Sequence, residues 1–136
     1  MKRLPDWDIR LAKFLESRKD TPFAWGTNDC TTFCCDAVLA MTGVDYAPAE
    51  LRVLRTAKEA YRAIKKFSNG SDIVGVVNNT LGAAKHKNYA TVGDVVSFVY
   101  NTEETLGICN GDNILTVTKN GIISVSMNCA TNTWKI

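Results

Sequence analysis

The residues with the clearest chemical potential are a cysteine and the loop before it, Trp25-Gly26-Thr27-Asn28-Asp29-Cys30. A thiolate attacks carbonyl carbons, and a free cysteine is mostly protonated near neutral pH. A helix N-terminus lowers the pKa of a thiol through its dipole and its unpaired amides. The same amides can stabilise an oxyanion. Cys30 therefore has one feature of a nucleophile if a helix begins beside it.

A structural role competes with this interpretation. Cysteine is among the residue types most often buried, and Cys30 shares a helical stripe with Cys34, Ala37 and Met41. The pattern alone leaves both roles open for Cys30. The other four cysteines are interpreted as core or near-core residues: Cys34, Cys35, Cys109 and Cys129.

The helix that must position Cys30 is the second of two in the first third of the chain. Apolar residues recur at helical spacing from Trp7 to Arg18, with Asp6 as the expected N-cap. The second helix is expected to begin near Asp29 and to end at Gly43, because glycine commonly stops a helix.

Two further helices and a set of strands follow. Thr56 and Glu59 have the form of a capping box that opens a helix closed by Asn69-Gly70, and residues 71–81 form a shorter one. The connection over residues 44–55 is expected to be irregular. After Val92 the apolar pattern becomes that of short β-branched runs separated by turn residues. The expected strands cover 95–100, 106–110, 114–118, 122–127 and, less regularly, 132–136.

Helices followed by an antiparallel meander predict an α+β fold, in which the N-terminal helices pack on a C-terminal antiparallel sheet. A length of 136 residues suits a single domain over 1–136. The apolar content of 46% and charged content of 22% are typical of globular proteins.

Charge and cysteine usage exclude several classes of function. The net charge of +2 creates no strong field for nucleic acid. No stretch approaches the roughly 20 apolar residues of a membrane span. The N-terminus lacks the apolar run of a signal peptide, so synthesis in the cytoplasm with reduced thiols is expected. Five cysteines without a Cys-x-x-Cys pair disfavour a disulfide framework and a zinc site, and we expect no cofactor.

Three motifs together resemble NlpC-type papain-like cysteine peptidases, which cut peptidoglycan stem peptides. Asp29-Cys30-Thr31-x-Phe33 is similar to their Asp-Cys-Ser-Gly-Phe, and Gly93-Asp94-Val95-Val96-x-Phe98 to their Gly-Asp-Leu-Val-x-Phe. The run from Leu106 to Gly111 is similar to the Val-Gly-Ile-Tyr-x-Gly that follows their catalytic histidine. The resemblance covers residues 23 to about 118 and implies a papain-like fold with Cys30 at the nucleophile position.

Both ends of the chain also resemble a group of small proteins encoded among the tail genes of tailed bacteriophages. The hallmarks of that group are present as Trp7 to Leu11, Pro22 to Cys30, Leu106 to Gly111 and Trp134-Lys135-Ile136. This resemblance implies synthesis in the cytoplasm of a host bacterium, a place in the virion tail, and other tail-tip or hub proteins as partners.

The chain departs from the peptidase pattern at two of the three catalytic positions. Alignment of the strand after the histidine puts Thr105 where the general base should be, and threonine cannot take a proton from a thiol near pH 7. The third polar residue, which orients the imidazole, falls near Val117. The one histidine, His86, precedes Gly93-Asp94, so it could act as base only if residues 83–91 folded back over the Cys30 helix.

Three functions remain in competition. The first is a structural component of the tail tip with Cys30 as a vestigial nucleophile, which the loss of both the base and its orienter favours. The second is a cysteine hydrolase of peptidoglycan peptides that uses His86 or a base from a partner chain. The third is a module that binds a cell-wall peptide without cutting it. None of them involves nucleic acid or insertion into a membrane.

Overall fold

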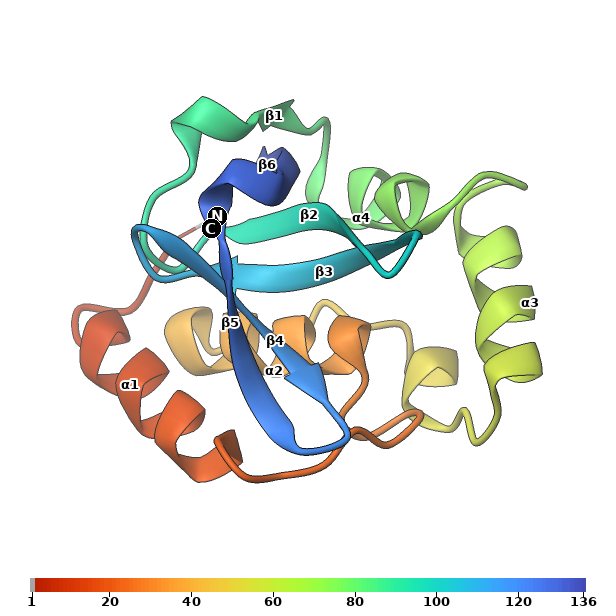
Figure 1. Cartoon of the computed structure of the whole chain (residues 1–136), viewed down its shortest axis with the longest axis horizontal. Coiled ribbons are helices and arrows are strands. Elements are labelled where there is room, and N and C mark those ends of the chain that lie inside the picture. Colours follow the sequence, from red (N-terminus) through yellow and green to blue (C-terminus); the bar gives the residue numbers. More distant parts are fainter. Residues whose placement is uncertain (1) are drawn as a thin grey trace.

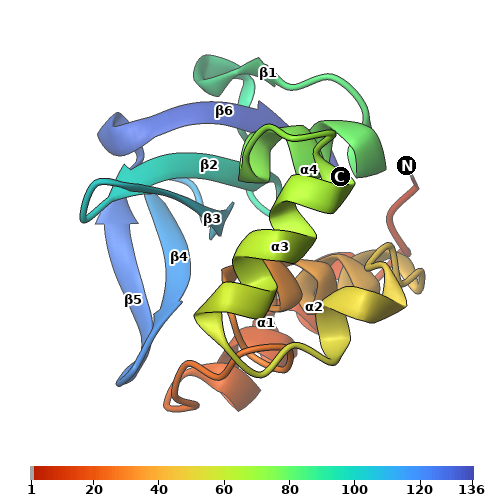
Figure 2. The ribbon, with the colours of Figure 1, turned by 90° about the vertical axis from the view of Figure 1, so that its right-hand side faces the viewer.

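The structure, a computed structural model, describes residues 2–136 and arranges them in two layers, with helices on one side of an antiparallel sheet (Figures 1 and 2). Within this range there are four α-helices: α1 Trp7–Arg18, α2 Cys30–Thr42, α3 Ala57–Phe67 and α4 Ile73–Leu81. The strands are β1 Lys85–His86, β2 Val95–Tyr100, β3 Glu103–Cys109, β4 Asn113–Thr118, β5 Gly121–Ser126 and β6 Ala130–Trp134. The α+β class is confirmed.

The four predicted helices are present, and their ends differ from the predictions by a few residues. Gly43 ends α2 in the left-handed conformation at φ 77°, as its role of stop signal requires. Asp6 occupies the N-cap position of α1, as predicted, but its side chain makes no capping hydrogen bond and pairs with Arg10 instead. Thr56 does cap α3, through a bond from the amide of Glu59 to its hydroxyl. The connection expected to be irregular contains a short 3-10 turn, Ala49–Arg52.

The sheet has the order β1-β6-β2-β3-β4-β5, with antiparallel pairing throughout. Strands β2 to β5 form the predicted meander. β6 then crosses back to pair with β2, a return that the strand pattern did not indicate. The two-residue strand β1, which pairs with β6, was also not predicted.

The core consists of two clusters, one on each face of the sheet. The larger one lies between the helices and the sheet and is built around Phe33, Met41, Leu106 and Trp134. The smaller one, with Phe98 at its centre, lies on the opposite face, which the β4–β5 hairpin crosses in Figure 1. None of the helices within residues 2–136 is long and apolar enough to cross a membrane.

The two ends of the chain meet at one buried carboxylate. Asp94, which is fully buried, accepts hydrogen bonds from Arg3, from Lys135, from Thr91 and from the backbone amide of Ile136. The Arg3 guanidinium also donates to the Ile136 carbonyl at 2.6 Å. The Gly-Asp motif therefore has a structural role here, since its aspartate joins the N-terminal and C-terminal segments beside β2.

Candidate functional site

Three of the four residues singled out in the sequence line one cleft of about 350 Å³. They are Cys30, from the start of α2, Thr105, from β3, and Val117, from β4. The cleft walls are the Phe23–Trp25 loop, the tip of the β2–β3 hairpin, and the inner faces of α3 and α4. The remaining lining residues are Phe23, Trp25, Asp29, Thr31, Leu51, Leu54, Ala60, Ile64, Ile73, Val76, Tyr100, Asn101, Glu103 and Glu104.

The cleft lies where β3 and β4 separate. These strands pair only at Ile108 with Leu115 and at Cys109 with Ile114, whereas β2 and β3 pair over six positions. The first half of β3 and the second half of β4 therefore lie apart. A close approach remains at Gly107, where a Cβ atom would stand 2.6 Å from the Leu115 carbonyl oxygen. Glycine at this position of the Leu-Gly-Ile-Cys motif thus has a packing reason.

The loop that carries Cys30 is held rigidly by Asp29. Its carboxylate accepts the amides of Gly26 and Thr32, each at 2.8 Å, and the Thr32 hydroxyl accepts the Asp29 amide at 3.0 Å. This reciprocal arrangement is a capping box. Gly26 adopts φ 79°, and a Cβ atom there would lie 2.4 Å from the Leu54 carbonyl oxygen. Both the aspartate and the glycine of the motif are therefore needed for the local backbone.

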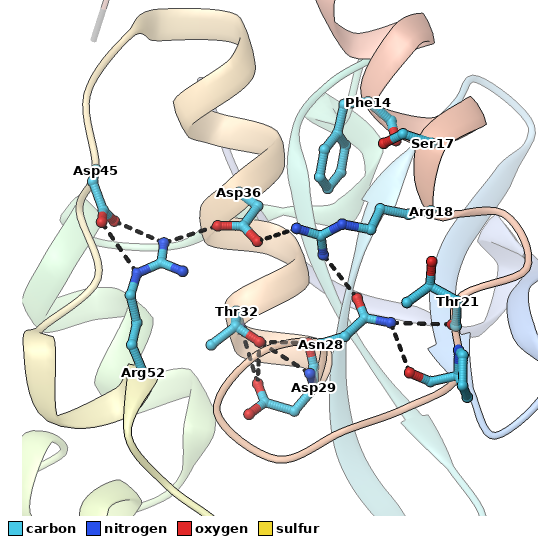
Figure 3. A network of polar contacts seen from close by, with 11 residues as sticks. Phe14, Ser17, Arg18, Thr21, Asn28, Asp29, Thr32, Asp36, Asp45 and Arg52 are labelled. Carbon is cyan, nitrogen blue, oxygen red and sulfur yellow. Dashed lines mark hydrogen bonds and ion pairs between the residues drawn. The ribbon is translucent and has the colours of Figure 1, made fainter.

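A chain of ion pairs fixes α2 against α1 and the 3-10 turn (Figure 3). Asp36, in the middle of α2, accepts Arg18 at 2.6 Å on one oxygen and Arg52 at 2.9 Å on the other. Arg18 also donates to the side chain of Asn28, and Arg52 donates to Asp45. Because these groups are partly buried, the network orients the helix whose first residue is Cys30.

The environment of Cys30 raises the pKa of its thiol above the usual value. Burial is the main cause, and the neighbouring Asp29 carboxylate acts in the same direction. Contacts with the Leu106 amide and with the Thr31 hydroxyl lower the pKa and do not reverse the result. Burial thus opposes the lowering of the pKa that a helix N-terminus alone would cause.

Neither of the two positions expected to complete a triad with Cys30 carries a general base. The Thr105 hydroxyl donates to the carbonyl of Glu103, and Val117 is 8% exposed with an apolar side chain. Neither can accept a proton from a thiol or orient an imidazole. The two positions identified from the spacing of the motifs are therefore placed together with Cys30, and both lack the polar chemistry of a catalytic triad.

His86 is not among the residues that line the cleft. It lies on β1, where it pairs with Asn132 of β6, and β6 and β2 separate it from β3 in the sheet. Its Nδ1 accepts the amide of Asn88, and the side chain is exposed. The segment of residues 83–91 does not fold back over α2. The position of His86 therefore gives no support to a role as the base for Cys30.

The remaining cysteines divide into two groups. Cys34 and Cys109 are buried and Cys35 is partly buried, in agreement with the predictions. Cys129 is exposed on the 3-10 turn Met127–Cys129, so its interpretation as a core residue was wrong. The apolar pattern before it belongs to β5, and the chain turns outward at Met127 before β6 begins. Burial holds the pKa of Cys34 well above its ordinary value and raises that of Cys35 to about 12.

We expect the Cys35→Ala variant to lose less stability than the wild type as the pH rises into the alkaline range. Below about pH 8.5 the thiol of Cys35 is protonated in both the folded and unfolded chains. The partly buried, protonated thiol then makes its full contribution to the free energy of unfolding. As the pH rises toward about 12, the unfolded chain releases this proton first, and the folded state loses stability. Urea titrations between pH 8.5 and 10.5 should show that the stability difference between wild type and Cys35→Ala shrinks by about 1 kcal/mol per pH unit.

Loss of a thiol by itself needs a control, and Cys129→Ala supplies it at an exposed position. A stability difference between wild type and Cys35→Ala that stays constant over this pH range would contradict the assignment of a raised pKa to Cys35.

Sequence reasoning missed two acidic residues of the cleft, Glu103 and Glu104, of which Glu104 is the less exposed. The register pairs Glu104 with Val99 on β2, and it alternates with Thr105 along β3. Its Oε2 atom is buried and has no hydrogen-bond partner among residues 2–136. Burial, with the nearby Asp72 carboxylate, raises the pKa of Glu104, while a contact with Thr131 lowers it. The sequence signal was weak, because Glu103-Glu104 has the appearance of a solvated turn.

Comparison with known proteins places the whole described chain in one family. A family model described as a domain of unknown function, DUF6950, matches residues 2–136. The match includes the cleft residues and both terminal segments that meet at Asp94. A search of curated proteins found none that matches the chain.

Proposed function

We propose that this chain, which belongs to the DUF6950 family of domains of unknown function, is a structural or assembly component of a bacteriophage tail tip. Its fold is proposed to be a papain-like domain of the NlpC type that has lost peptidase activity. Cys30 marks the former nucleophile, and the partners are other tail-tip or hub proteins.

One observation carries the proposal: Cys30, Thr105 and Val117 line the same cleft. In a cysteine peptidase of this type, these positions would hold the nucleophile, the base and the residue that orients the base. Their convergence supports descent from such an enzyme, and their side chains support the loss of its chemistry. The raised pKa of the Cys30 thiol agrees with this loss, since the thiolate is the reactive species.

The alternative is an active hydrolase that aids penetration of the cell wall. It is favoured by the cleft itself and by Cys30 at its floor beside the start of α2. It lacks a histidine base in the cleft, because the only histidine of the chain lies on β1, outside the cleft lining. We therefore rank the structural role first.

The two functions differ in what a phage tolerates at Cys30. In the phage that encodes the chain, we expect Cys30→Ala to leave the number of plaques unchanged, whereas a stop codon early in the gene should abolish infectious particles. Mass spectrometry of purified particles should detect the protein. A loss of infectivity by Cys30→Ala as large as that caused by the stop codon would favour the hydrolase. Absence of the protein from particles that assemble normally would remove the structural proposal.

A further inference from the structure

The charges and surfaces of the cleft are matched to one kind of occupant. Most of its lining is apolar, from Ile64 on α3, Val76 on α4 and the loop at Phe23. Trp25 and Tyr100 add aromatic surface, and Tyr100 is 38% exposed. A volume of about 350 Å³ is within the range of sites that bind small ligands or several side chains.

Every charged residue of the lining is acidic. Asp29, Glu103 and Glu104 contribute carboxylates, and no Lys, Arg or His is found among the lining residues of the described chain. The Asp29 carboxylate is already bound by the amides of Gly26 and Thr32. The other two carboxylates have no such neutralisation, since Glu103 is exposed and Glu104 keeps one buried oxygen without a hydrogen-bond partner.

The basic side chains on the adjoining wall do not supply the missing counter-charge. Arg52 is held by Asp36 and Asp45. Arg55 donates its guanidinium to the Leu54 carbonyl oxygen at 2.8 Å. A carboxylate with one buried oxygen and no counter-charge is unfavourable, so a cation placed in the cleft would gain both Coulomb attraction and contact with aromatic faces.

We propose that the cleft binds a segment of a partner protein in which a lysine or arginine side chain stands between apolar residues. The apolar neighbours would lie against Ile64 and Val76, and the cationic group would lie on the side of Glu103 and Glu104. Binding without cleavage rests on the proposed loss of catalysis, whereas the charge preference rests on the cleft alone.

The test uses capped tripeptides as probes and amide chemical shifts of the full chain as the readout. Acetyl-Leu-Lys-Leu-amide is expected to shift the resonances of Cys30, Thr31 and Thr105 with a millimolar dissociation constant. The matched peptides carry glutamate or norleucine in place of lysine. We expect the glutamate peptide to bind at least about fivefold more weakly than the lysine peptide, because its charge has the same sign as the cleft. Equal affinities of the three peptides, or shifts confined to other surfaces, would overturn the inference.

Variants of the protein locate the charge preference. Glu104→Gln should weaken binding of the lysine peptide about fivefold and leave the norleucine peptide unchanged. Glu16→Gln, on the far exposed face of α1, is the matched control and should change neither affinity. Loss of affinity for both peptides in Glu104→Gln would instead indicate a structural role of this residue and contradict the inference.

Two further results distinguish the inference from alternative explanations. If spermidine bound the cleft more tightly than the lysine peptide, the occupant would be a free polyamine, and the proposal of a protein segment would be wrong. Turnover of a muropeptide would remove the proposed loss of catalysis and leave the charge preference intact. Conversely, failure of the lysine peptide to bind removes the inference and leaves the structural role in the tail unaffected.

Discussion

Thr105→His is expected to increase the rate of Cys30 alkylation by iodoacetamide at pH 7 about tenfold. Cys30 and Thr105 line the same cleft, so an imidazole at position 105 would be added to the wall that also carries the thiol. A fall of about two units in the thiol pKa would give roughly 100-fold more thiolate. The lower intrinsic nucleophilicity of that thiolate removes about one factor of ten. Mass spectrometry of the alkylated peptides separates Cys30 from the other cysteines.

The control for Thr105→His is a histidine at a distant position of the same sheet. Ser124 is exposed on β5, the strand at the far edge, and Ser124→His should leave the alkylation rate of Cys30 at its wild-type value. An unchanged rate in Thr105→His, in a variant that folds, would show that more than the base has been lost. The inferred correspondence of Thr105 with a catalytic histidine would then be wrong.

Asp94→Ala is expected to lower the free energy of unfolding by about 3–4 kcal/mol, which corresponds to a fall in Tm of roughly 10 °C. The substitution leaves the Arg3 guanidinium, whose side chain is 16% exposed, without its carboxylate partner. It also removes the acceptor of the Ile136 amide. Lys135 contributes less to the loss, because its side chain is 39% exposed and can turn to water. Urea denaturation measures the difference.

Asp112→Ala is the matched control for the loss of a carboxylate, since Asp112 is exposed in the turn between β3 and β4. Its effect should stay within about 0.5 kcal/mol. If Asp94→Ala were no more destabilising than Asp112→Ala, the meeting of the two chain ends at Asp94 would not contribute to stability.

Much of the fold could be predicted because its local signals agree with its tertiary structure. Gly43 and Thr56 mark helix boundaries through backbone chemistry that needs no distant partner. β2 was predicted with its correct ends, since its apolar run is bounded by turns on both sides. The pairing of β6 with β2 and the existence of β1 depend on contacts between residues far apart in the chain. Periodicity carries no information about such contacts.

The three residues that the motif spacing predicted to lie together, Cys30, Thr105 and Val117, line one cleft. Spacing along two strands sufficed to place Thr105 and Val117 near Cys30, because the register of a meander is fixed by its turns. A sequence shows the helix end at Cys30 and does not show the burial that raises the pKa of its thiol. Glu104 escaped notice for the same reason: only the folded hairpin buries one of its oxygens beside the cleft.

The central claim is that Cys30 marks the nucleophile position of a former peptidase, in a cleft whose lining holds no histidine to activate it. The most direct measurement is the pH dependence of Cys30 alkylation by iodoacetamide in the wild-type protein, followed site by site by mass spectrometry. We predict a rate at pH 6–7 no higher than that of a model thiol, with an increase that continues above pH 9. A rate that is already high and independent of pH between 6 and 7 would reveal an activated thiolate and contradict the account.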